Sequence, residues 1–170
     1  AIEKASELFN KIASKIIKTT VGEAELVKLY SSSWRYIQFA TANQFYMIAN
    51  DFEVDYDRVR DIMIDGYDRA KGLPSAGFAA GPCLVKDTMQ LASFNNNHFL
   101  LGQAAMNINE GLPEYLVTNL KKNVDLKGKT IGILGMAFKA NVDDTRDSLS
   151  YKLRKILLFE EARVICSDPF

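Results

Sequence analysis

The sequence predicts an α/β chain in which a mainly helical region, built around one long helix, precedes the opening β–α–β unit of a doubly wound parallel sheet. Residues 23–50 contain neither proline nor glycine, so one uninterrupted helix is expected there. After residue 125, two short runs rich in β-branched residues, 130–135 and 163–166, flank a helical pattern over 148–159. That order is typical of a parallel crossover unit.

The first twenty residues are predicted to form a helix over 2–13 and a short strand over 15–20. Ile2, Leu8 and Ile12 lie near one face of the helix, and the strand is rich in β-branched residues. A helix and a strand this close to the start resemble the tail of a larger α/β domain. Because only two strands of the later sheet are present as well, we expect the chain to be truncated at both ends.

The long helix over 23–50 is apolar on more than one face, which indicates burial on more than one side. At the usual rise per residue it would be about 40 Å long. We expect it to form both a spine between domains and the contact of a homodimer, in which two copies of the helix cross. Its larger apolar residues are Leu26, Leu29, Tyr30, Trp34, Ile37, Phe39, Phe45, Met47 and Ile48.

A loop rich in glycine and proline is predicted over residues 65–82. It follows a helix over 54–64 and precedes helices over 84–94 and 98–122. Loops of this length inside compact domains are usually functional. The small side chains of this loop would let its backbone approach a ligand closely. Residues 125–129 then form a polar link to the first strand.

Composition and charge exclude several classes of protein. Lys plus Arg and Asp plus Glu number 21 each, which argues against nucleic-acid binding. No apolar run approaches the roughly 18 residues of a membrane helix, and no secretory signal is recognisable, so a cytoplasmic protein is expected. Two cysteines and the single His98 are too few for a disulfide framework, a structural zinc site or a Ser/His/Asp hydrolase. We expect no bound metal, and His98 in a loop or at a helix start.

Cys83 is the strongest candidate for a reactive residue because it ends the glycine-rich loop and begins a helix. A helix N-terminus stabilises the thiolate through its exposed N–H groups and its dipole. Asp87 lies one turn further along the same helix, and the adjacent Lys86 offers positive charge. The alternative, a buried structural cysteine, is disfavoured by the place of Cys83 after Gly81 and Pro82.

Two further groups of polar residues could carry chemistry. Lys28 lies amid apolar neighbours in the long helix, with Ser32 four residues later on the same face. Its amine either extends to solvent or projects into a polar site. The glycine pattern over 132–137, where the first strand ends in a turn, is weak evidence for nucleotide binding on its own. Phe138, Lys139 and the charged run 143–148 follow it, at the strand end where open α/β sheets bind ligands. The alternative for that run is a solvated turn with a helix cap.

Three stretches in this order resemble the UDP-glucose and UDP-N-acetylhexosamine 6-dehydrogenases. They are residues 21–28 (VGEAELVK), 81–87 (GPCLVKD) and 132–148, which include Ala137-Phe138-Lys139. The resemblance covers essentially the whole chain. It implies the tail of an NAD-binding Rossmann domain over 1–20, a helical central domain over 21–124, and the start of a Rossmann-like UDP-sugar-binding domain over 125–170.

The resemblance also implies an activity, the NAD-dependent twofold oxidation of the C6 hydroxymethyl of a UDP-sugar to the uronate. Cys83 would form a thiohemiacetal and then a thioester. Lys28 and Ser32 would contact the substrate and stabilise its oxyanions, and Asp87 would orient or activate water. The remaining implied contacts are Lys86 and Arg146 with NAD, and Pro74, Ser75, Gly77, Phe78, Ala80, Phe138 and Lys139 with the sugar nucleotide.

Ser32 is a departure from the family, which typically has asparagine four residues after the catalytic lysine. A serine hydroxyl reaches less far, so weaker stabilisation of the oxyanion is expected. The family's dinucleotide fingerprint and catalytic glutamate are not found in residues 1–170, and this chain alone is expected to be inactive. Two other functions stay open: a non-catalytic helical dimerisation module, and a hydroxyacid dehydrogenase with a helical second domain, which would not need Cys83.

Overall fold

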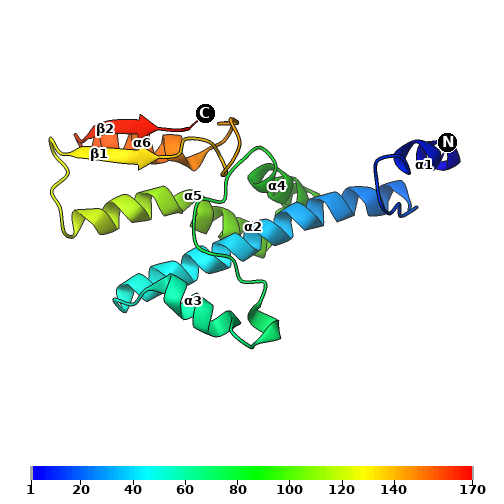
Figure 1. Cartoon of the computed structure of the whole chain (residues 1–170), viewed down its shortest axis with the longest axis horizontal. Helices are drawn as coiled ribbons and strands as arrows, with labels where there is room; N and C mark the ends of the chain where they lie inside the picture. Colours follow the sequence, from blue (N-terminus) through cyan, green and yellow to red (C-terminus); the bar gives the residue numbers. More distant parts are fainter. Residues whose placement is uncertain (1, 170) are drawn as a thin grey trace.

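The computed structural model describes residues 2–169 and confirms the predicted fold class (Figure 1). No helix in this range is long and apolar enough to cross a membrane. The helices are α1 (Ile2–Phe9), α2 (Val21–Asp51), α3 (Tyr56–Ile64), the short 3₁₀ helix η1 (Asp68–Ala70), α4 (Leu84–Phe94), α5 (Leu100–Lys121) and α6 (Leu149–Phe159), and the strands are β1 (Thr130–Leu134) and β2 (Arg163–Ser167).

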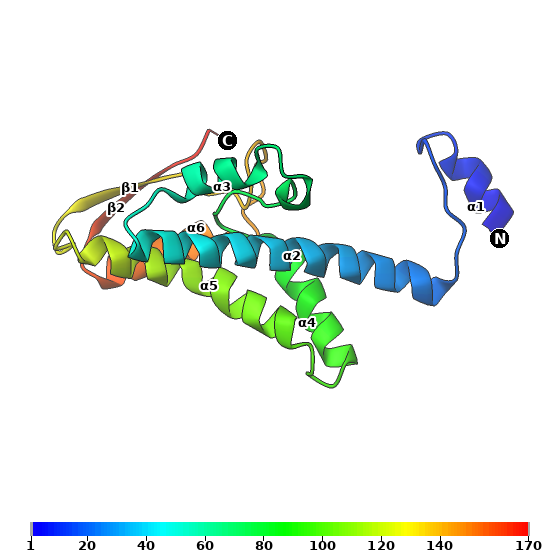
Figure 2. The same ribbon diagram turned by 90° about the horizontal axis from the view of Figure 1, so that it is seen from below.

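The long helix α2 begins at a capping box. The Thr20 side chain accepts a hydrogen bond from the Glu23 N–H at 3.3 Å, and the Glu23 carboxylate accepts one from the Thr20 N–H at 2.9 Å. Hydrogen bonds from Thr19 and then from Thr20 lower the pKa of Glu23 to about 2. The cap therefore carries a negative charge at the positive end of the helix dipole. From there α2 runs unbroken for 31 residues and forms the spine seen along Figure 2.

Helices α4 and α5 pack against α2 and enclose the core of the helical part. A buried amide pair lies in this core. Asn43 on α2 donates to the side-chain oxygen of Asn109 on α5 at 2.9 Å, and Asn109 donates to the Tyr36 carbonyl at 3.0 Å. Because buried amides need partners, this pair fixes how α5 lies against α2. The apolar residues of this core are Tyr36, Ala40, Ala79 and Ala105.

The C-terminal part is the predicted β–α–β unit. Strands β1 and β2 pair in parallel, from Thr130 opposite Arg163 to Leu134 opposite Ser167, and α6 forms the crossover between them. Figure 1 shows the two strands side by side with α6 against them. Helices α5 and α6 pack with the sheet around Val117, Leu126, Ile133, Met136, Leu157 and Ala162.

The predicted strand over 15–20 is wrong. These residues form an irregular link, and α1 ends at Phe9 rather than at residue 13. A strand needs a neighbour for its backbone groups, and no strand in the described part of the chain lies beside this segment. Lys18 instead pairs with Glu3 at 2.9 Å, which ties the link back to α1. Figure 1 shows α1 standing apart at the start of α2. His98 lies in the loop between α4 and α5, as predicted.

Candidate functional site

Cys83 lies where the glycine-rich loop ends and α4 begins, as predicted. Its thiol is free and exposed, and its carbonyl accepts a hydrogen bond from the Asp87 N–H at 2.9 Å. The loop reaches it through Gly81, whose φ of +101° favours glycine. Gly81 is buried against a ring: a Cβ at this position would lie 2.6 Å from Cδ2 of Phe138. The glycine-rich loop is therefore in direct contact with the segment that follows β1.

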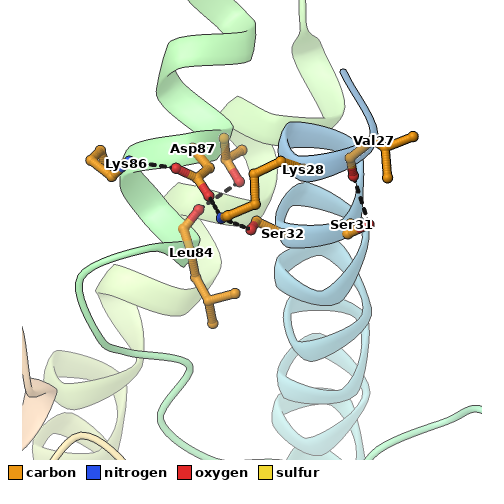
Figure 3. Close-up of polar contacts among 8 residues, drawn as sticks. Val27, Lys28, Ser31, Ser32, Leu84, Lys86 and Asp87 are labelled. Atoms are coloured by element: carbon orange, nitrogen blue, oxygen red, sulfur yellow. Dashed lines mark hydrogen bonds and ion pairs between the residues drawn. The ribbon is translucent and has the colours of Figure 1, made fainter. Parts of the chain in front are cut away.

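Lys28, Ser32 and Asp87 form one hydrogen-bonded network between α2 and α4 (Figure 3). The Lys28 ammonium donates to the Ser32 hydroxyl at 3.0 Å and to Oδ2 of Asp87. From the other side the Lys86 ammonium donates to Oδ1 of Asp87 at 2.5 Å. The Lys28 side chain is 60% exposed and that of Asp87 only 2%. A buried carboxylate thus anchors an ammonium group that solvent can reach.

The charge of Asp87 is set by two opposing effects. Burial by itself would raise the pKa of Asp87, because a charge is less stable away from water. Hydrogen bonds from Lys28, Lys86 and Ser32 outweigh burial and lower the pKa to about 2. Asp87 is therefore ionised at neutral pH. A carboxylate this weakly basic is a poor proton acceptor, and its position suits a residue that holds Lys28 in place.

Two cations, Lys86 and Arg146, lie close enough to Cys83 to interact with the charge of its thiolate. For each, a hydrogen-bonded carboxylate has the larger effect. The pKa of Lys86 is raised chiefly by its hydrogen bond to Asp87, and the Cys83 charge adds to this. The pKa of Arg146 is raised chiefly by its hydrogen bonds to Asp144, at 2.7 Å for the shortest. Two ion pairs, Lys86 with Asp87 and Arg146 with Asp144, therefore lie near the thiol.

A pocket of about 440 Å³ opens at Cys83 between α2, the glycine-rich loop and the segment after β1. Three segments that are far apart in the sequence thus meet at one place, two of them with cationic side chains. The buried Asp87 does not line the pocket but binds Lys28, which does. The predicted residues that line it are Lys28, Ser32, Phe78, Ala80, Cys83, Phe138 and Lys139.

Three of the predicted sugar-nucleotide contacts do not line this pocket, and neither do the predicted NAD contacts Lys86 and Arg146. The Pro74 carbonyl accepts a hydrogen bond from the Tyr56 hydroxyl at 3.0 Å. Gly77 donates its N–H to the Asn43 side chain at 2.8 Å and accepts from the same amide at 3.0 Å. Pro74 and Gly77 therefore anchor the loop, while Ser75 is exposed. Sequence analysis missed Asn43, because one asparagine in a long helix forms no recognisable pattern.

Sequence analysis also missed pocket residues on α2. Ser31, Arg35 and Phe39 line the pocket together with Lys28. They follow Lys28 at i+3, i+7 and i+11, spacings that share one face of a helix. The helical period could have identified them, but the sequence argument followed that face only as far as Ser32.

The site places a free thiol and an anchored ammonium group in one pocket, a combination that suits attack on a carbonyl carbon. A thiol can supply the electron pair, and an ammonium group can stabilise the resulting oxyanion. The site lies at the junction between the helical spine and the Rossmann-like unit. The chain belongs to the UDP-glucose/GDP-mannose dehydrogenase family: residues 22–111 match its central domain and residues 132–170 match its UDP-binding domain.

Several relatives are similar over nearly the whole chain. The UDP-glucose 6-dehydrogenase AglM of Haloferax volcanii is 31% identical over 180 residues, covering 99% of this chain and 41% of the relative. Among solved structures, the UDP-D-ManNAc dehydrogenase of Pyrococcus horikoshii has a TM-score of 0.88 at 29% identity, covering 99% and 41% of the two chains. For the UDP-glucose dehydrogenase of Pyrobaculum islandicum the TM-score is 0.86 at 28% identity, with 99% and 40% covered. The chain thus spans about two fifths of the length of these relatives.

Proposed function

We propose that the protein acts in the NAD-dependent twofold oxidation of the C6 hydroxymethyl group of a UDP-sugar to the uronate. The observation that carries this proposal is the pocket lined by both the free Cys83 thiol and the Lys28 ammonium, which the buried Asp87 anchors. Membership of the family supports a dehydrogenase reaction and a UDP-sugar substrate. Its relatives include enzymes named for UDP-glucose and for UDP-N-acetyl-D-mannosamine, so the proposal is for the class of substrate.

In the proposed reaction the hydroxymethyl group first loses a hydride and a proton and becomes an aldehyde. The Cys83 sulfur adds to the aldehyde carbon, and the thiol proton passes to the carbonyl oxygen, which gives a thiohemiacetal. Loss of a second hydride and of the hydroxyl proton leaves a thioester. Water cleaves the thioester to the carboxylate and regenerates the thiol. NAD⁺ supplies the hydride acceptor in both oxidations.

Lys28 would stabilise the negative charge that develops on the reacting oxygen. An ammonium group has three N–H donors, and two of them are used in the hydrogen bonds to Ser32 and Asp87. The third is left for the substrate oxygen. The low pKa of Asp87 supports an orienting role for this carboxylate, toward Lys28 and toward the attacking water, over proton abstraction.

Lys86 and Arg146 suit contacts with NAD because both are exposed cations beside the thiol, at 63% and 73% exposure. Cations of this kind bind phosphate well, and the planar guanidinium of Arg146 can do so with two hydrogen bonds. We assign residues 1–20 to the NAD-binding domain, 21–124 to the central domain and 125–170 to the UDP-sugar-binding domain. The residues proposed to hold the sugar nucleotide in the pocket are Phe78, Ala80, Phe138 and Lys139.

The test is uronate formation by the full-length gene product carrying Cys83→Ser, with Cys166→Ser as a matched control. Both thiols are free and exposed, but Cys166 does not line the pocket. Because a hydroxyl is far less nucleophilic than a thiolate, Cys83→Ser should stop uronate formation and Cys166→Ser should leave it unchanged. Undiminished turnover of the Cys83→Ser variant would remove the covalent mechanism.

We also propose that two copies of the chain dimerise through α2. An apolar stripe on this helix is exposed, and patches of this kind mark interfaces. Trp34→Glu should therefore give monomers in light scattering at tens of micromolar, while Val59→Glu on α3 should not. A monomeric wild-type protein under these conditions would refute the dimer. The stripe consists of Val27, Tyr30, Trp34, Phe45 and Ile48, which are 62%, 55%, 62%, 41% and 45% exposed.

A further inference from the structure

The turn that follows β1 binds a carboxylate from the end of β2. Gly135 has a φ of +96° and donates its N–H to the Ser167 carbonyl at 2.8 Å, which brings the two strand ends together. The next two backbone N–H groups, of Met136 and Ala137, both donate to Oδ2 of Asp168, the second at 3.0 Å. Asp168 is half-buried there.

Consecutive backbone N–H groups that point to one place form a cradle for an anion. In dinucleotide-binding units such a cradle, at the end of the first strand, receives the phosphates of the ligand. In this chain the cradle holds the protein's own carboxylate. The two N–H groups that follow Gly135 are therefore already paired with a carboxylate of the protein.

The segment that Asp168 holds leads directly to the candidate site. After Ala137, the Phe138 N–H donates to the Asp144 carbonyl at 3.0 Å. The Phe138 ring packs on Gly81, two residues before Cys83. The Lys139 ammonium lies 5.6 Å from the centre of the same ring. Both Phe138 and Lys139 line the pocket of Cys83.

We propose that Asp168 is a positioning residue of this site. Its carboxylate takes the place that a phosphate takes in dinucleotide-binding units, and so fixes residues 136–139. The fixed segment presents Phe138 and Lys139 to the pocket and supports the loop before Cys83. The link from Asp168 to the loop before Cys83 consists of its hydrogen bonds to residues 136 and 137 and of the packing of Phe138 on Gly81. Only its kinetic consequence rests on the proposed function, since Phe138 and Lys139 would hold the sugar nucleotide.

The test compares three changes at Asp168 with a matched control, in the full-length gene product. Asp168→Asn keeps a side-chain oxygen in place for both N–H groups but removes the charge. Asp168→Glu keeps the charge but moves the oxygens, and Asp168→Ala removes the acceptor. The control is Asp125→Ala, because Asp125 also accepts a backbone hydrogen bond, from Lys127 at 3.1 Å, but lies outside the pocket.

Amide hydrogen exchange measures the structural link without any assay of activity. Asp168→Ala should speed the amide exchange of residues 136–139 by about tenfold. This factor is the lower end of the range expected when a hydrogen bond to a charged group is lost. Exchange of residues 79–83 should rise as well, because Gly81 packs on the Phe138 ring. Asp168→Glu should behave like Asp168→Ala, while Asp168→Asn and Asp125→Ala should stay within about threefold of the wild type in both segments.

Steady-state kinetics then measure the consequence. Asp168→Ala should raise KM for the UDP-sugar about tenfold and change kcat less, because it disturbs binding more than the reacting groups. Asp168→Asn should restore KM. Unchanged exchange of residues 79–83 in Asp168→Ala, or equal losses in Asp168→Asn and Asp168→Ala, would overturn the positioning role. A wild-type protein without dehydrogenase activity would refute the proposed function instead, and hydrogen exchange would still decide the role of Asp168.

Discussion

Gly81 offers a sharp test of how the loop before Cys83 is held, because an added methyl group would face two separate costs. The first is conformational: a residue with a Cβ in the left-handed region costs about 1–2 kcal/mol, and the φ of Gly81 is +101°. The second is steric. The new Cβ would lie 2.6 Å and 2.8 Å from two Phe138 ring carbons, whereas carbon atoms pack best at about 3.5–4.0 Å.

The ring must therefore move by about 1 Å, and such overpacking costs about 1–3 kcal/mol. Together the two effects predict that Gly81→Ala lowers the free energy of unfolding by about 2–5 kcal/mol. Gly128→Ala isolates the conformational cost, because Gly128 has a φ of +70° and open space where its Cβ would be. Gly77→Ala, with open space and no positive φ, should be nearly neutral.

Denaturant unfolding followed by circular dichroism measures these differences, and alkylation of Cys83 reports the shape of the loop. Adding Phe138→Ala should recover the steric part, so the two changes should couple by about 1–3 kcal/mol in a double-mutant cycle. If Gly81→Ala costs no more than Gly128→Ala and shows no coupling to Phe138, the contact between the loop and the segment after β1 does not support Cys83.

Three further predictions concern polar residues on α2 and on the helix α4 that packs against it. Asn43→Ala should cost about 2–4 kcal/mol, because it leaves buried loop and Asn109 groups without partners; thermal unfolding measures this. Ser32→Asn should raise kcat by up to about tenfold, since an amide reaches the developing oxyanion better than a hydroxyl; steady-state turnover measures this. Because the folded-state pKa of Asp87 is about 2 against its ordinary 3.8, its ionisation contributes stability above pH 3.8 that is lost as the pH falls toward 2; acid unfolding of the wild type and of Asp87→Asn measures this.

Each of these predictions has an outcome that contradicts it. Asn50→Ala is the control for Asn43, since Asn50 donates one half-buried hydrogen bond to Tyr115 at 3.2 Å; equal losses would deny a special role to the buried amide pair. A kcat that does not rise in folded Ser32→Asn, with unchanged substrate affinity, would favour a water that bridges Ser32 to the reacting oxygen. If the acid unfolding curves of the wild type and of Asp87→Asn are parallel, the ionisation of Asp87 does not contribute to stability in this pH range.

The sequence predicted correctly those elements that depend on neighbouring residues in the chain. The end of the glycine-rich loop at Cys83 predicted α4 with the bounds that the structure has, and the run without proline or glycine predicted α2 to within two residues. The predicted strand over 15–20 was wrong because a strand needs a neighbouring strand, and the composition of the segment itself does not show whether one is present. The same reason hid Asn43 and Asp168. Each acts through backbone groups far away in the sequence, and no local pattern of residue types marks such a contact.

The glycine-rich loop is tied to the helices by few side-chain hydrogen bonds, chiefly those of Asn43 with Gly77, Tyr56 with Pro74 and Arg60 with Leu73. A segment with so few ties opens at a lower free energy than the helices that carry it. In rising denaturant the pocket should lose its shape first, and a protease should cut within residues 65–82 before the helical signal falls. A preparation of this protein should therefore keep its full helical signal after the pocket at Cys83 has lost its shape.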